Sequence, residues 1–139
     1  GRDITARELL ERGARRVDSG LARQPELQAE LLDVLGVIHR DLGMYPEADS
    51  LLARAVRLSR ARYGERHPQV AAKSIDWAAV LAARGEYARA ESLLVAAHGM
   101  VRRRGAPDDS LLATALGALA SVRRLRGTSP ERSRSTGKR

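Results

Sequence analysis

The chain has no cysteine and no phenylalanine, and its aromatic residues are one tryptophan and three tyrosines. Without cysteine it can form no disulfide framework, use no cysteine nucleophile and offer no thiolate to a metal. No uninterrupted apolar run approaches the roughly 20 residues of a membrane-spanning helix, so we expect no membrane contact by this segment. Only three histidines are present, which argues against an enzyme with a deep polar site. The composition of the 139 residues, 43% hydrophobic and 30% charged, is typical of one globular domain.

Positive charge is concentrated at the C-terminal end of the chain. The formal net charge is +8, and the residues from Arg123 onward include seven basic side chains and one acidic side chain. The rest of the chain is therefore nearly neutral. Residues 128–139 are polar and lack apolar periodicity, which predicts a basic, disordered tail after a folded domain spanning 1–127. Nucleic-acid binding through this arginine-rich tail is an alternative function, but the scarcity of aromatic residues for base stacking argues against it.

The sequence repeats itself with a period of 42 residues. Between residues 43–63 and 85–105, nine of 21 aligned positions are identical. The same shift aligns three glycines, Gly43, Gly85 and Gly127. Ahead of each glycine, a large residue followed by a small one recurs in register, at Leu35-Gly36, Trp77-Ala78 and Leu119-Ala120. Three units in one register indicate a repeat architecture.

Each repeating unit is predicted to be a pair of helices, because apolar residues recur at three- and four-residue spacing in both halves. We expect first helices at 28–42, 69–84 and 109–126, second helices at 46–63 and 87–103, and one preceding helix at 5–19. Thr5 and Glu8 have the spacing of a capping box, and Pro46 suits a first helical turn. The glycine after each first helix is expected to close it in the left-handed conformation. Small residues such as Gly36 and Ala78 allow paired helices to approach closely.

These residues resemble the tetratricopeptide repeat in its long, 42-residue form, as in kinesin light chains and many bacterial proteins. The matching features are the large–small pair of the first helix, the Gly-x-Tyr turn and the alanine–leucine–alanine pattern of the second helix. The His67-Pro68 dipeptide is similar to the inter-repeat loop of that form. The resemblance covers residues 1–127 and implies an all-α tetratricopeptide-repeat solenoid of about six helices, two full repeats plus flanking half-repeats. A HEAT-type array has a similar period and is the alternative.

A second resemblance concerns the first 45 residues. The run Glu8-Leu9-Leu10-Glu11-Arg12-Gly13-Ala14, with the segments 21–28 and 31–43, is similar to a helix that follows the kinase domain of large bacterial serine/threonine protein kinases. In those proteins 42-residue tetratricopeptide repeats come next. The resemblance implies a non-catalytic regulatory segment of such a kinase, since none of the kinase's own motifs occurs here. The chain opens on Gly1 rather than Met, so we expect it to be a piece of a longer polypeptide.

A free-standing tetratricopeptide adaptor is the alternative to the kinase segment. Such an adaptor would be cytoplasmic, whereas a segment attached to a membrane-spanning kinase has no predicted location. In both cases the expected partner is a protein or peptide.

In the family that the chain resembles, the concave face of the first helices binds the partner. The resemblance therefore implies a protein–protein interaction or scaffold module that holds a peptide or helix in this groove. The family often places asparagines there, whereas this chain has Asp33, Ile75 and Gly117 in that register. The middle of the groove is small and apolar, which favours an apolar segment or a helix, and arginines at its ends suit an acidic group. The predicted groove residues are Asp33, Val37, Arg40, Ile75, Asp76, Ala79, Ala82, Ser121 and Arg124.

Other chemically reactive residue types have structural interpretations. The three histidines are too scattered for the i, i+4 pairing of a helical zinc site, and we expect packing or loop roles for His39 and His67 and a core or groove-edge position for His98. Asp108 and Asp109 are expected to cap a helix. No serine has a histidine at a suitable repeat offset, so a nucleophilic triad is not supported. We predict no catalytic residue, no metal and no cofactor.

Two further expectations concern packing. Trp77 shares the register of Leu35 and Leu119, which predicts a core position. The helix at 109–126 has no second helix after it, so Leu112, Leu116 and Leu119 are expected to pack on the preceding unit alone or to pair with another chain. The second possibility predicts a homodimer through this terminal helix.

Overall fold

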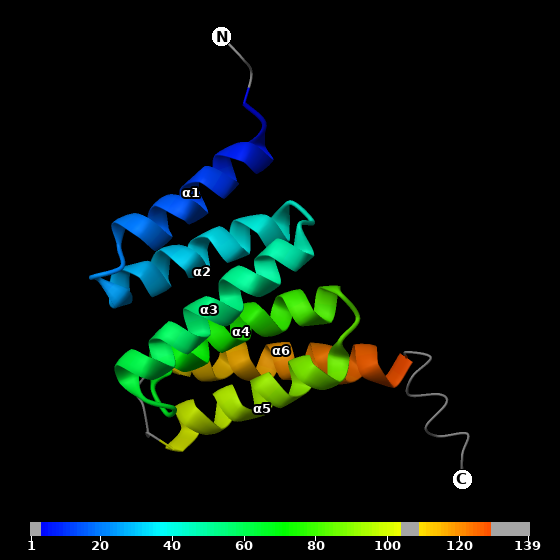
Figure 1. Ribbon diagram of the computed structural model, residues 1–139. Helices are drawn as coiled ribbons and strands as arrows, with labels where there is room; N and C mark the ends of the chain where they lie inside the picture. The colour runs from blue at the N-terminus through cyan, green and yellow to red at the C-terminus, as the bar shows by residue number, and fades with distance from the viewer. Residues whose placement is uncertain (1–3, 104–108, 129–139) are drawn as a thin grey trace.

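The computed structural model describes residues 4–103 and 109–128 of the chain. This part is all-α, with six helices and no strand. The helices are α1 (Ala6–Gly20), α2 (Pro25–Asp41), α3 (Tyr45–Tyr63), α4 (Pro68–Ala83), α5 (Tyr87–Arg103) and α6 (Asp109–Thr128). Figure 1 shows α1 to α4 following one another in chain order, with α6 seen between α4 and α5. Every helix expected from the sequence is present, whereas the division into a domain at 1–127 and a tail stays a prediction.

Local sequence explains where the helices begin. The side chain of Thr5 accepts a hydrogen bond from the backbone N–H of Glu8 at 3.1 Å, which confirms half of the expected capping box. A proline stands in the first turn of α2, α3 and α4, where its missing N–H leaves no hydrogen bond unmade. Pro25 starts α2 three residues earlier than the apolar spacing predicts, because its fixed φ already suits a helix.

The turns that close the first helices use glycine as expected. Gly43 after α2 and Gly85 after α4 have backbone φ angles of +76° and +80°, values that residues with a Cβ rarely adopt. Gly127 differs from this expectation, because α6 continues through it to Thr128. The residues after Gly127 lack the Tyr and Ala that begin the second helix of the other units, so α6 is not turned back at this point.

Helices that are adjacent in sequence form the main contacts. The closest approach is between α2 and α3 at Gly36, where an added Cβ would lie 2.4 Å from Cγ of Leu52. One core cluster joins α3, α4, α5 and α6 around Leu81, Leu94 and Val101, which are almost fully buried. A second cluster joins α1, α2 and α3 around Leu32. The first helices of the pairs also touch one another, α2 against α4 and α4 against α6.

Ion pairs secure α6 to the rest of the molecule. Glu91 of α5 accepts a hydrogen bond from Nε of Arg123 at 2.9 Å and pairs with Arg126. The hydrogen bond from Arg123 and the nearby Arg126 lower the pKa of the Glu91 carboxyl below its usual range. Two of the basic residues counted in the C-terminal excess are therefore engaged with the folded part.

Candidate functional site: the face of the first helices

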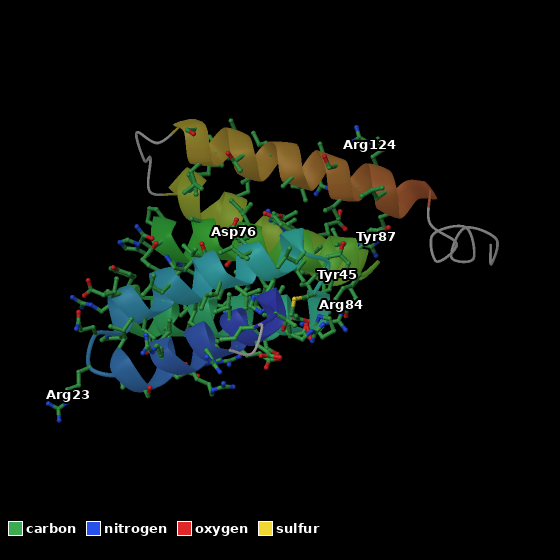
Figure 2. All side chains as sticks on the ribbon, turned by 90° about the horizontal axis from the view of Figure 1, so that it is seen from above. Arg23, Tyr45, Asp76, Arg84, Tyr87 and Arg124 are labelled. Carbon is green, nitrogen blue, oxygen red and sulfur yellow. The ribbon has the colours of Figure 1, made fainter. Side chains whose placement is uncertain are left out.

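The predicted groove residues lie on three helices, α2, α4 and α6. On α2 and α4, most of them are half-buried, and on α6 Ser121 is half-buried and Arg124 is exposed. Figure 2 shows Asp76 near the middle of the array and Arg124 toward the end where Tyr45 and Tyr87 lie. Ile75 differs from the expected surface position, because it is only 8% exposed and belongs to the core that includes Ala115 of α6. Its position in the repeat places Ile75 on the side of α4 that faces α6, and α6 covers it.

Asp33 of α2 and Asp76 of α4 meet where these two helices touch. Burial of the Asp33 carboxyl, together with the hydrogen bond to Asp76 and the charge of Asp76, raises the pKa of Asp33 to about 8. Its Oδ1 is buried with no donor among the described residues. A proton held between the two carboxyls satisfies both observations, since two adjacent carboxylates repel each other. At this point α2 and α4 therefore meet through a polar contact rather than an apolar one.

Lys73 lies beside this pair and is a residue that sequence reasoning missed. It is 3% exposed, and its Nζ donates to Glu30 of α2 at 2.5 Å and to Gln69 at 3.0 Å. The charge of Lys73 partly offsets the raised pKa of Asp33. The sequence contained a signal for the role of Lys73. It is one of only two lysines in the chain, and the equivalent positions in the other units hold the apolar residues Leu31 and Ala115.

A cavity of about 600 Å³ opens next to Glu30, at the end of the array where α2 and α4 begin. Glu26, at its rim, pairs with Arg62 of α3, and Tyr63 stacks on His67 with ring centroids 4.3 Å apart. Its lining is mixed in polarity, with Leu27 and Pro25 beside the charged groups. In Figure 2, Arg23 marks this end, opposite to Tyr45 and Arg84.

Trp77 has a polar contact that its predicted core position did not anticipate. It is half-buried against two core clusters, and its Nε1 donates to Asp49 of α3 at 2.8 Å. Asp49 also accepts from Arg84 at 2.6 Å, and the Arg89 guanidinium lies 6.0 Å from the Trp77 ring centroid. Cavities of about 410 and 550 Å³ adjoin the tryptophan between α3 and α5. Their several arginines give this surface a positive character.

The histidines lie apart and have structural contacts. His39 is 2% exposed, and its Nδ1 is 2.7 Å from the carbonyl oxygen of Leu35, which requires the tautomer with hydrogen on Nδ1. Nδ1 of His67 accepts from the N–H of Gln69 at 3.0 Å and caps α4. His98 is half-buried on α5. Among the residues that the structure describes, no three His, Asp or Glu side chains gather in a way that would hold a metal.

The expected apolar stripe of α6 is largely covered. Leu119 is 6% exposed and Leu112 is half-buried in the core shared with α4 and α5, whereas Leu116 remains 48% exposed. The first of the two alternatives, packing on the preceding unit, therefore accounts for most of the stripe. The expected cap at Asp108 and Asp109 lies outside the described residues and side chains, as does the tail expected at 128–139, except that Thr128 is the last residue of α6.

Comparisons with known proteins add no relative. Neither a scan of protein-family models nor a search of curated proteins found a match to this chain. Within the described segments, no helix combines the length and apolar character needed to cross a bilayer.

Proposed function

We propose that the chain is a tetratricopeptide-repeat interaction module that binds a protein segment along α2, α4 and α6. The observation that carries this proposal is that burial follows the 42-residue period. Ala48 and Ala90 are both fully buried, as are Ala55 and Ala97, and Leu52 and Leu94 are at most 1% exposed. These equivalent residues are therefore buried to the same extent in successive helix pairs. This agreement favours a stacked repeat array, in which the function belongs to an extended face rather than to a deep site.

The partner that suits this face is an apolar segment or helix with an acidic group. Val37, Ala79 and Ala82 are small or apolar and half-buried, so they leave room for a partner to pack closely. Arg124 is exposed without an ion-pair partner among the described residues, and it can hold a carboxylate. Arg40 is less available, since its Nε is 3.3 Å from Oδ1 of Asp41.

Ile75 is not a suitable position for testing the groove, because its side chain is buried in the core. Replacing Ile75 with glutamate would bury a charge in the core, so lost binding would report unfolding rather than the groove. We would instead select peptides from a random library on the immobilised chain and measure their affinity for Ala79→Glu. We expect at least about tenfold weaker binding, because an unpaired charge would enter an apolar contact.

Ala96→Glu is the matched control, since Ala96 is exposed on α5 away from the groove. This variant should bind the selected peptides as the wild type does. Equal affinity for the wild type and Ala79→Glu would refute the groove. Arg124→Ala tests the acidic group separately, and we expect it to weaken the binding of peptides that carry a carboxylate.

The proposed cellular context is the regulatory part of a bacterial serine/threonine protein kinase, with a free-standing adaptor as the alternative. This context rests on the resemblance of the first 45 residues. Mass and peptide mapping of the native polypeptide test it: kinase peptides upstream of Gly1 support the proposal, and a native chain of about the 15.1 kDa of this sequence contradicts it.

A further inference from the structure

A row of apolar side chains runs along the outer face of α2. Five large hydrophobic residues, between 36% and 54% exposed, follow the spacing i, i+4, i+7, i+11 and i+15. No other helix in the described segments presents such a row. These residues, named here the α2 stripe, are Leu27, Leu31, Val34, Ile38 and Leu42.

The equivalent positions in the middle of the other first helices are covered, whereas Gln69 and Arg84 at the two ends of the row on α4 are exposed. One repeat after Ile38, Val80 of α4 is fully buried against Ala48 and Leu52 of α3, and two repeats after it Val122 of α6 is 4% exposed. Among the described helices, only α1 comes before α2 in the chain, and it does not cover this face, since Ile38 remains 40% exposed. The α2 stripe is therefore a stacking face of the array that the described helices leave open.

The chemistry of the α2 stripe restricts what can cover it. On α4 the covering helix α2 brings Glu30 to Lys73 and Asp33 to Asp76. The stripe has Leu31 and Val34 at those positions, so a helix with acidic residues like those of α2's inner face would bury unpaired carboxylates there. The occupant must be apolar at matching spacing. The stripe itself has this property, since apolar residues four and three apart form the seam of two paired helices.

Charged residues flank the α2 stripe with opposite signs. At 100° per residue, Glu30 and Asp41 lie along one edge of the stripe. They pair with Lys73 and Arg40, but their side chains stay 54% and 66% exposed. The other edge adjoins α1, where Gly13 approaches Leu35 and where Arg12 and Arg16 line a cavity of about 520 Å³. These two arginines are exposed and have no ion pair among the described residues. When two such faces meet with helices parallel, the acidic edge of each faces the basic edge of the other, whereas antiparallel helices bring like edges together.

We propose that two copies of this chain associate through the α2 stripe, with the two α2 helices parallel about a twofold axis. Each apolar residue then meets its counterpart, and Arg12 and Arg16 of one copy face Glu30 and Asp41 of the other. This dimer uses the face of α2 beside α1, not the terminal helix α6. It leaves Ala79 and Ala82 of α4 outside the seam, so its test does not depend on binding at these two residues.

Sedimentation velocity on the 139-residue chain tests the association. We expect a concentration-dependent dimer whose dissociation constant rises at least about 30-fold in Val34→Glu, because an unpaired charge would enter the seam. Val95→Glu is the matched control: Val95 of α5 is 48% exposed and Val34 is 50% exposed, but Val95 lies outside the stripe. Circular dichroism checks that both variants keep their helix content. A monomer at all concentrations, or equal dimerisation by Val34→Glu and wild type, overturns the proposal.

Single-cysteine variants test the orientation, because the chain has no cysteine of its own. With parallel helices, Leu27→Cys and Leu42→Cys each form disulfide-linked dimers on their own under mild oxidation. If a disulfide forms only in a mixture of the two variants, the helices are antiparallel and the proposed arrangement is wrong.

Discussion

At the scale of single residues, the pH dependence of stability centres on Asp33. Its pKa of about 8 in the folded chain lies above its ordinary value, so the folded state holds a proton that the unfolded state releases. Its contribution to stability is full below about pH 4 and is lost as the pH rises through about 8. We expect Asp33→Asn to raise the free energy of unfolding by about 2 kcal/mol at pH 9, less than the full linkage value because Asp33 is partly open to solvent.

Urea unfolding of both proteins at pH 4 and pH 9 measures this difference. The gain should shrink toward pH 4, where wild-type Asp33 is itself protonated. Asp41→Asn, at an exposed carboxylate on the same helix, is the control variant. A constant difference between Asp33→Asn and wild type across this pH range would contradict the raised pKa of Asp33.

The residues of the predicted groove show what a position in the repeat can predict and what it cannot. The register predicts that Asp33 and Asp76 lie on first helices, and both do. It does not reveal that they touch, because their contact depends on how α2 lies against α4. Ile75 has the register of Asp33 but is buried, since α6 packs over it. A position in the register thus specifies a helix face, and the neighbouring helix determines its exposure.

At the scale of helices, the packing of α2 on α3 depends on Gly36. A Cβ at this position would lie 2.4 Å from Cγ of Leu52, so alanine forces the helices apart. We expect Gly36→Ala to lower the free energy of unfolding by about 2 kcal/mol despite the better helix propensity of alanine. Thermal and urea unfolding measure the change.

Gly117 provides the comparison, because it lies within α6 and an added Cβ meets nothing within 4 Å. Gly117→Ala should raise the free energy of unfolding by about 1 kcal/mol. The two glycine substitutions therefore have opposite expected signs. If both stabilise the chain, the close approach at Gly36 is not the constraint described above.

At the scale of the whole molecule, stability is expected to decline toward the N-terminal end. Val17 is the single buried residue of α1, whereas α4 has eight buried residues and contacts helices on both sides. We expect amides in the middle of α1 to exchange with solvent at least about 100-fold faster than those of α4, because a helix with little buried area opens locally. Hydrogen exchange followed by mass spectrometry measures both, and equal protection of α1 and α4 would contradict this gradient.

The sequence by itself determined the helices and their pairing. Their caps, prolines, turn glycines and apolar spacing are local, so the 42-residue period shows them without knowledge of any contact. Only the tertiary structure decided which equivalent residues are covered. Lys73 is buried while Leu31 is open, and the pKa of Asp33 is raised beside Asp76, because each helix face is completed by a neighbour that differs from unit to unit. Exposure and pKa are properties of that pairing, which the period alone does not contain.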